Sequence, residues 1–214
     1  SGSGDENVPA RSGYVSITTT TGLSTSKSVS QSGVAITYQA LLYLTVGSTD
    51  YTTYEFPATG GSGTLKPIGI TYHNGVEYAR VTLSATYLSG SDTTYIKRSG
   101  TTVTASNLNR TEMPAASTTY SVSWKGKSGS ITARQEANVR YKYIQLGSFT
   151  KTFGAAGGST TLSATKYSTY TANSTPLNEG SSGITYSLGS ASSAPTTMGS
   201  ISGTSLSISN LLDT

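Results

Sequence analysis

The sequence predicts an all-β chain built from tandem antiparallel sandwiches, and three observations support this prediction. Ser and Thr occur 37 times each and, with 24 Gly and 15 Tyr, give the composition of strands and turns. Only 11% of the 214 residues are charged and the net charge is +4, too little for the charge-driven disorder that a low aliphatic content would otherwise favour. Short runs of β-branched and aromatic residues recur between turn residues, several with a period of two.

The predicted strands follow one another at the short intervals typical of sandwiches. They cover residues 14–18, 34–38, 41–46, 68–72, 78–87, 101–104, 120–124, 130–133, 139–146, 160–164, 184–188 and 205–208. Asn74-Gly75 predicts a type I′ hairpin turn, because both central residues of that turn need a positive φ. Residues 38–46 could be helical by composition, but the segment is short, lacks caps and is rich in Tyr, Thr and Val. We therefore expect a buried strand there.

Two internal repeats indicate a duplicated domain. Residues 56–65 match residues 153–162 at seven of ten positions. Residues 99–108 match residues 202–211 at six of ten positions, in the same order along the chain. The offset between the copies changes from 97 to 103 residues, and surface loops tolerate insertions of that size.

The repeats divide the chain into three predicted parts. Residues 1–47 form an N-terminal segment, with the last strand of a preceding repeat and connecting strands; residues 48–138 form a complete repeat; residues 139–214 form a second repeat without its last strands. Missing strands leave an open sheet edge, and open edges pair with other strands. Residues 10–18 resemble residues 126–132, so the surplus strand and the missing strand look alike.

Two explanations of this pattern stay open. The residues belong to a longer tandem array, or the N-terminal segment of one molecule completes the second repeat of the next in a head-to-tail homo-oligomer. In the second explanation the partner is another subunit, held by strand pairing at the open edge.

Three motifs resemble a known family of repeats. They are Phe-x-Ala-x-Gly-Gly-Ser at 56–62, Ser-Gly-Thr-x-Val-x-Ala-Ser-Asn at 99–107 and Lys-Ser-Gly-Ser-Ile-Thr-Ala-Arg-Gln-Glu-Ala-Asn at 127–138. These motifs are similar to the BACON-type and related immunoglobulin-like repeats of Bacteroidota surface proteins and crAss-like phage proteins. The resemblance covers residues 48–138 and part of 148–214, but not residues 19–47. It implies tandem immunoglobulin-like antiparallel β-sandwiches, and no catalytic residue comes with that fold.

The sequence indicates neither an enzyme nor a metal or cofactor site. It has no Cys, and its one histidine, His73, lies beside the Asn74-Gly75 turn. Nucleophile elbows, phosphate loops, dinucleotide fingerprints and calcium loops are absent from the sequence. Two of its carboxylates could converge for glycoside hydrolysis, but no spacing singles out a pair. No run of 18 apolar residues occurs, so no membrane insertion is expected.

The positive charge is concentrated in residues 125–142, which hold five basic residues and one acidic residue. Strand alternation there places Tyr141 and Tyr143 on one face and Arg140 and Lys142 on the other. Tyr rings stack on sugars and basic neighbours favour sulfated or sialylated glycans, so these four residues are the candidate ligand site. The alternative is a strand buried against its own sheet, with basic residues guarding an edge. The basic residues are too few for nucleic-acid binding.

A second set of residues is expected to be structural. Trp124 is the only tryptophan and is predicted to anchor a core, where its replacement by Ala would destabilise the fold by about 3–5 kcal/mol. The other structural residues are expected at turns that use positive φ rather than in a phosphate cradle: Gly60, Gly61, Gly157, Gly158, Asn74 and Gly75.

These observations favour a non-catalytic structural and adhesion module, located outside the cell, on a cell surface or on a virion. Its expected partners are a host or mucin glycan and another subunit that pairs with the open edge. The alternative is an accessory carbohydrate-binding module of a glycan-degrading surface enzyme.

Overall fold

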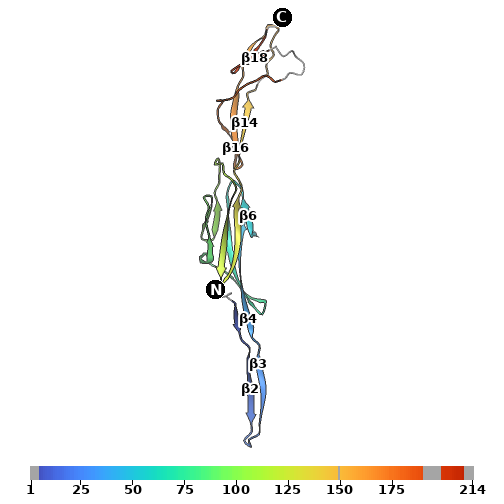
Figure 1. Ribbon diagram of the computed structural model, residues 1–214, viewed down its shortest axis with the longest axis vertical. Coiled ribbons are helices and arrows are strands. Elements are labelled where there is room, and N and C mark those ends of the chain that lie inside the picture. Colours follow the sequence, from blue (N-terminus) through green and yellow to red (C-terminus); the bar gives the residue numbers. More distant parts are fainter. Residues whose placement is uncertain (1–4, 149, 190–198, 210–214) are drawn as a thin grey trace. The chain divides into compact units, whose positions relative to one another are not determined.

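The computed structural model describes residues 5–148, 150–189 and 199–209 (Figure 1). Within these ranges the chain forms nineteen β-strands and one short 3-10 helix, η1 (Ala85–Tyr87). The prediction of an all-β chain with antiparallel sheets is confirmed. The chain divides into two compact units. Unit 1 consists of Ser1–Leu108 and Met113–Ala137, and unit 2 of Asn109–Glu112 and Asn138–Thr214.

The larger sheet of unit 1 is built around two long strands. Its strand order is β1 (Glu6–Val8), β4 (Val34–Val46), β7 (Gly61–His73), β11 (Thr102–Ala105) and β10 (Ile96–Ser99). Two shorter strands pair beside this path, β5 (Thr49–Tyr51) with β4 and β8 (Val76–Thr82) with β7. β4 and β7 are 13 residues long and antiparallel, so they carry most of the sheet.

The second sheet of unit 1 contains β6 (Thr53–Phe56), β13 (Lys127–Gln135), β12 (Ala116–Trp124) and β9 (Leu88–Gly90), in that order. β6 and β13 are parallel, whereas the other pairs are antiparallel. Side chains from both sheets share one hydrophobic core, with Leu42, Leu65 and Val103 from the first sheet and Tyr120 and Ile131 from the second. The hairpin β12–β13 therefore supplies one side of that core.

Unit 2 contains two sheets of three strands each. One has the order β14 (Arg140–Leu146), β16 (Ala164–Tyr170) and β17 (Asn173–Asn178). The other has the order β15 (Gly158–Thr161), β19 (Ser205–Ile208) and β18 (Gly199–Ser202). Burial is sparse in the part of unit 2 that the structure describes, and Ala164, Tyr170 and Leu206 are its buried hydrophobic residues.

A separate hairpin precedes β4 in the chain. Its strands β2 (Arg11–Thr18) and β3 (Ser24–Gln31) run side by side (Figure 1). Among the described residues they pair only with one another. Every residue of the two strands is exposed except Gly13, which is half-buried. Two-stranded hairpins are at best marginally stable alone in water. In the described residues this hairpin packs against no sheet, whereas β12–β13 packs against β4.

The described strands of unit 2 correspond to strands of the larger sheet of unit 1. At the repeat offset of 97, Ala164 of β16 corresponds to Pro67 of β7. Leu146 lies opposite Ala164, and Leu42 lies opposite Pro67, so β14 corresponds to β4 at an offset of 104. The same hydrogen bond marks both hairpin turns: the amide of Asn74 donates to the carbonyl of Ala35 at 2.8 Å, and that of Thr171 to the carbonyl of Val139 at 3.0 Å.

Candidate functional site

In unit 1 the hairpin β12–β13 covers the inner face of β4. Tyr120, Val122, Ile131 and Ala133 of this hairpin are fully buried. The backbones approach so closely that a Cβ atom added to Gly129 would lie 2.7 Å from the carbonyl oxygen of Ala40. As a result, Ala40 and Leu42 on the inner face of β4 are only 3% exposed.

The equivalent face of unit 2 is uncovered in the described part of the chain. Ile144, which corresponds to Ala40, is 62% exposed, and Leu146, which corresponds to Leu42, is 56% exposed. Both line an apolar cleft of about 450 Å³, together with Leu162, Ala164, Ile184, Thr185, Tyr186, Ser187, Leu188, Gly189, Ile201 and Leu206. We call the side of β14 and its neighbours that carries Ile144, Leu146, Leu162 and Ala164 the inner face of unit 2.

The neighbouring edge of unit 2 is also unpaired in the described residues. In unit 1, β6 pairs with β13, Phe56 is buried, and the amide of Glu136 donates to the Phe56 carbonyl at 2.9 Å. Residues 150–153 are the equivalent of β6 at the repeat offset, but they belong to no strand, and Phe153 is only half-buried. No strand of the described residues takes the place that β13 has in unit 1.

The outer face of β14 carries the two tyrosines of the predicted ligand site. Tyr141 and Tyr143 are both exposed, so they are not buried against their own sheet. The ring of Tyr143 stacks on that of Tyr167 from the neighbouring strand β16, with centroids 5.6 Å apart and an interplanar angle of 20°. This pair forms an exposed aromatic surface suited to stacking against a flat apolar ligand face.

The two basic residues of the predicted site lie on the opposite side of β14, because neighbouring residues of a strand face opposite ways. Arg140 forms an ion pair with Glu179, and its guanidinium lies 5.9 Å from the centroid of the Tyr170 ring. The nearby Ser168 hydroxyl and the Arg140 guanidinium hold the pKa of Glu179 below its ordinary value. Arg140 is therefore engaged within its own unit, whereas Lys142 is exposed.

Trp124 packs at the end of the unit 1 core. It is half-buried, and its ring meets that of Tyr38 edge-on, with centroids 5.4 Å apart and an interplanar angle of 87°. A Cβ atom added to Gly69 would lie 2.8 Å from the Trp124 ring, so the ring rests directly on the backbone of β7. These contacts are those of a packing residue.

The predicted turn residues have positive φ with the exception of Gly61, which is the first residue of β7, so the prediction of positive φ is wrong for Gly61. Asn74 and Gly75 have φ values of 50° and 81°, as a type I′ turn demands, and they join β7 to β8. Gly60 and Gly157 have φ values of 82° and 68° in the two copies of the repeat. The glycines that follow them lie against aromatic rings, because an added Cβ would be 3.3 Å from Phe56 at Gly61 and 3.4 Å from Phe153 at Gly158.

The one histidine of the sequence makes a ring contact. His73 stacks on Tyr78 with ring centroids 3.9 Å apart. No group of three or more His, Asp or Glu side chains in the described ranges could hold a metal ion. None of the helical structure found in those ranges is long and apolar enough to cross a membrane.

Comparison with models of known protein families, with curated proteins and with solved structures found no match to this chain.

The inner face of unit 2 was not among the sites predicted from the sequence. The sequence pattern indicated the tyrosines and basic residues of β14 as a ligand site, whereas Ile144 and Leu146 have the pattern of ordinary core residues of a strand. The signal is their position on the strand. Ile144 and Leu146 alternate on the face that β12–β13 covers in unit 1, and this becomes visible only once β14 is aligned with β4.

Proposed function

We propose that this chain is a non-catalytic structural module of an extracellular or virion appendage, built from tandem immunoglobulin-like sandwiches, and that it joins other subunits through the inner face of unit 2. The observation that carries the proposal is the exposure of Ile144 and Leu146, compared with the burial of Ala40 and Leu42. Burying a large aliphatic side chain is worth about 1.5–3 kcal/mol, so an uncovered face of this kind favours association.

The test is sedimentation velocity of the whole chain over a wide range of concentration, alone and with extracts of its natural assembly. We expect species larger than the monomer, which disappear in an Ile144→Ser, Leu146→Ser double variant. A Tyr141→Ser, Tyr143→Ser variant is the matched control, because it changes the outer face of the same strand. Association that is insensitive to the inner-face substitutions would contradict the proposal.

Glycan binding by the outer face of β14 is a second candidate function, supported by the exposed Tyr143–Tyr167 stack. It fits both an adhesin and an accessory module of a glycan-degrading enzyme. Binding to an array of mucin-type glycans would be measured in low salt and at about 0.5 M salt, where exposed ionic contacts are largely screened. Binding that Tyr143→Ser abolishes and Ile144→Ser leaves intact would support glycan binding by this face. Absence of binding to every glycan of the array would contradict it.

A further inference from the structure

The hairpin β2–β3 is the counterpart of the hairpin β12–β13. Arg11 lies opposite Gln31 in the first hairpin, and Ala116 lies opposite Gln135 in the second. The residues before each hairpin also match, Val8-Pro9-Ala10 in one case and Met113-Pro114-Ala115 in the other. β2 therefore corresponds to β12 at an offset of 105, and β3 to β13 at an offset of 104. This alignment differs from the one that short motifs gave, which matched residues 10–18 to β13.

One face of β2–β3 combines the aliphatic residues Val15, Ile17 and Val29 with the polar residues Arg11, Thr25, Lys27 and Gln31. Val15 and Ile17 stand at the positions of Tyr120 and Val122, which are fully buried in unit 1, but they are 54% and 64% exposed. Val29 of β3 likewise stands at the position of Ala133. The opposite face carries Tyr14 among small hydroxyl residues: Ser12, Ser16, Thr18, Ser24, Ser26, Ser28 and Ser30. The hairpin thus has its aliphatic residues on one face, and nothing covers that face in the described residues.

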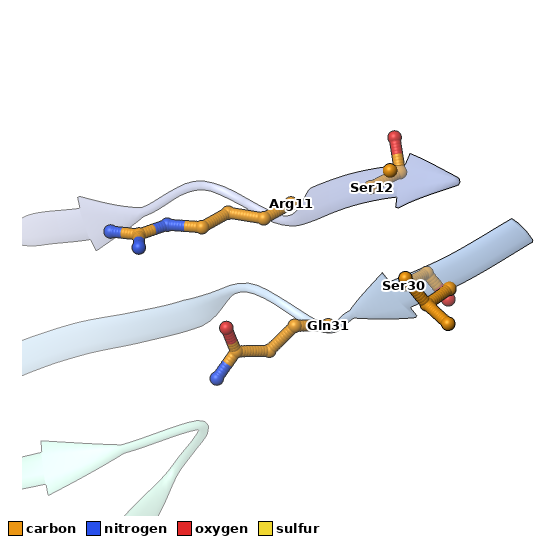
Figure 2. Close-up of a pocket in the computed structure, with 6 residues that line it drawn as sticks. Arg11, Ser12, Ser30 and Gln31 are labelled. Carbon is orange, nitrogen blue, oxygen red and sulfur yellow. The ribbon is translucent and has the colours of Figure 1, made fainter. Parts of the chain in front are cut away.

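A polar group of the closing hairpin is preserved as well. In unit 1, Gln135 is fully buried and its Nε2 donates to the carbonyl oxygen of Ser106 at 2.7 Å. Gln31 takes the same place in β3, and Figure 2 shows its side chain beside that of Arg11 on the neighbouring strand. Gln31 is exposed, so it has no such burial in its own hairpin. The counterpart of Ser106 is Ser209, which lies in unit 2.

The order of the chain indicates which unit such a hairpin closes. Residues Asn109–Glu112 belong to unit 2, but β12–β13, which follows them, closes unit 1. A hairpin therefore closes the unit that precedes it in the sequence. β1 pairs with β4 of unit 1, so by the same rule β2–β3, which follows β1, closes a unit other than unit 1. Closing unit 2 of its own chain would reverse this order. Unit 2 of a second copy can take the place of the preceding unit without reversing it.

We propose that β2–β3 of one copy closes unit 2 of a second copy. This proposal rests on the function proposed above, and it adds the identity of the partner and the element that binds it. Val15 and Ile17 pack on Ile144 and Leu146, β3 aligns along residues 150–153, and Gln31 donates to the carbonyl of Ser209. Donor and acceptor surfaces differ, so the contact is heterologous and repeats from head to tail.

The donor and acceptor differ from unit 1 in ways that are complementary. Thr25 stands where unit 1 has Gly129, so its Cβ sets β3 farther from β14 than β13 lies from β4. Ile17, Val29 and Ile144 are larger than their counterparts Val122, Ala133 and Ala40 and fill the wider gap, although Val15 is smaller than Tyr120. Lys27 stands at the position of the buried Ile131. A lysine can lie along an apolar surface with its methylene stem while its ammonium group reaches the rim. Lys27→Ile should consequently strengthen the association.

The test uses two variants of the whole chain, each lacking one surface. The donor variant carries Val15→Ser and Ile17→Ser, and the acceptor variant carries Ile144→Ser and Leu146→Ser. In sedimentation velocity we expect the unsubstituted chain to form a concentration-dependent ladder of oligomers and each variant alone to be monomeric. An equimolar mixture of the two variants should form a dimer and stop there, because it retains one donor and one acceptor. Such a dimer also shows that both variants are folded.

One control variant and one further test variant separate the proposed contact from non-specific association. Tyr14→Ser removes the most exposed ring of the opposite hairpin face and should leave the ladder unchanged. Gln31→Ala should shorten the ladder without changing the circular dichroism spectrum. A donor variant that still assembles like the unsubstituted chain would overturn the hairpin as donor, while leaving association through unit 2 intact. A chain that stays monomeric at all concentrations would overturn the second copy as partner. If that chain also associates with no partner from its natural assembly, the function proposed above fails with it.

Discussion

Units 1 and 2 share strand pairing but differ in burial. In both, the repeated glycine turn closes with the same hydrogen bond, from Gly60 to the carbonyl of Pro57 and from Gly157 to the carbonyl of Gly154, each at 2.9 Å. Yet the inner face of β4 is buried and that of β14 is not. The difference teaches that pairing of strands sets the shape of such a sheet, whereas the hairpin laid over it creates the core.

The hairpins β12–β13 and β2–β3 also differ in their polar contacts. Tyr120 donates from its hydroxyl to a carboxylate oxygen of Asp92 at 3.1 Å, and burial together with this carboxylate raises the pKa of Tyr120 to about 12. The counterpart of Tyr120 in β2 is Val15, which can make no such bond. The closing hairpin of unit 1 is therefore held by a polar contact that Val15 cannot make, and this difference is consistent with the docking proposed for β2–β3.

A matched pair of substitutions, one in β4 and one in β14, tests most directly whether the two units differ in burial. Leu42→Ala should destabilise unit 1 by about 2–5 kcal/mol, because it leaves a cavity in a closed core. Leu146→Ala should change the stability of the monomer by less than about 0.5 kcal/mol, because its side chain is already in water. Urea unfolding followed by hydrogen exchange in each unit measures both. Equal losses at the two positions would mean that unit 2 has a closed core after all.

Trp124→Ala tests the same contrast at the end of the hairpins. Because its ring packs on Tyr38 and on the backbone at Gly69, we expect a loss of about 3 kcal/mol from unit 1. The counterpart in the N-terminal hairpin, Thr19→Ala, should have little effect. Differential scanning calorimetry provides the readout, and an unchanged melting temperature for Trp124→Ala would contradict its role in packing.

Part of this architecture was predictable from the sequence, since some local rules are strong. Asn74-Gly75 predicted its turn because few other dipeptides accept positive φ twice in succession. The duplicated glycine block predicted matching turns for the same reason. Residues 19–47 fell outside the family resemblance, although the strand at 34–46 was predicted. β3 was not predicted, because it consists mostly of Ser and Thr with Val29 as its single aliphatic residue, and such a strand carries almost no periodic signal.

The candidate site was harder to predict than the fold. Tyr141 and Tyr143 were visible as exposed aromatics of a basic strand, but burial depends on partners far away in the sequence. Whether Ile144 is a core residue or a surface residue depends on a hairpin that covers Ala40 in unit 1 and is missing over β14 in the described residues. That information lies in tertiary structure rather than in local pattern.

Gly60→Ala sharpens the comparison at the shared turn. With φ at 82°, an alanine there is strained, and its Cβ would lie 2.6 Å from the carbonyl oxygen of Ala105. We expect a loss of about 1–2 kcal/mol from unit 1. Gly75→Ala is the control, since Gly75 has a similar φ with no atom near the added Cβ, and it should be the milder change. A smaller loss at Gly60 than at Gly75 would show that the close approach is irrelevant.

The smallest and most selective difference between the two units is expected in how their stability responds to acid. The pKa of Asp50 in unit 1 is lowered by the Thr45 hydroxyl and by Lys66, and that of Glu179 in unit 2 by the neighbouring Ser168 hydroxyl and by Arg140. Each depressed pKa stabilises the folded state above the ordinary carboxyl pKa, and this contribution is lost as the pH falls through the folded value. Glu179→Gln should remove acid sensitivity in that range from unit 2 alone, and Asp50→Asn from unit 1 alone. Hydrogen exchange in each unit, measured between neutral and acidic pH, checks this. Identical acid profiles for the Glu179→Gln variant and the parent would refute it.

The path of the chain between the units has a consequence for the time course of synthesis. A ribosome makes Asn109–Glu112, which belong to unit 2, before it makes the hairpin that closes unit 1. A nascent chain that ends near residue 112 therefore carries unit 1 in the same open state in which unit 2 is found here. If β2–β3 docks as proposed, the hairpin of a finished neighbour would compete with β12–β13 for the open sheet during that interval. Slower translation through residues 113–135 would then increase the number of chains that close on another copy.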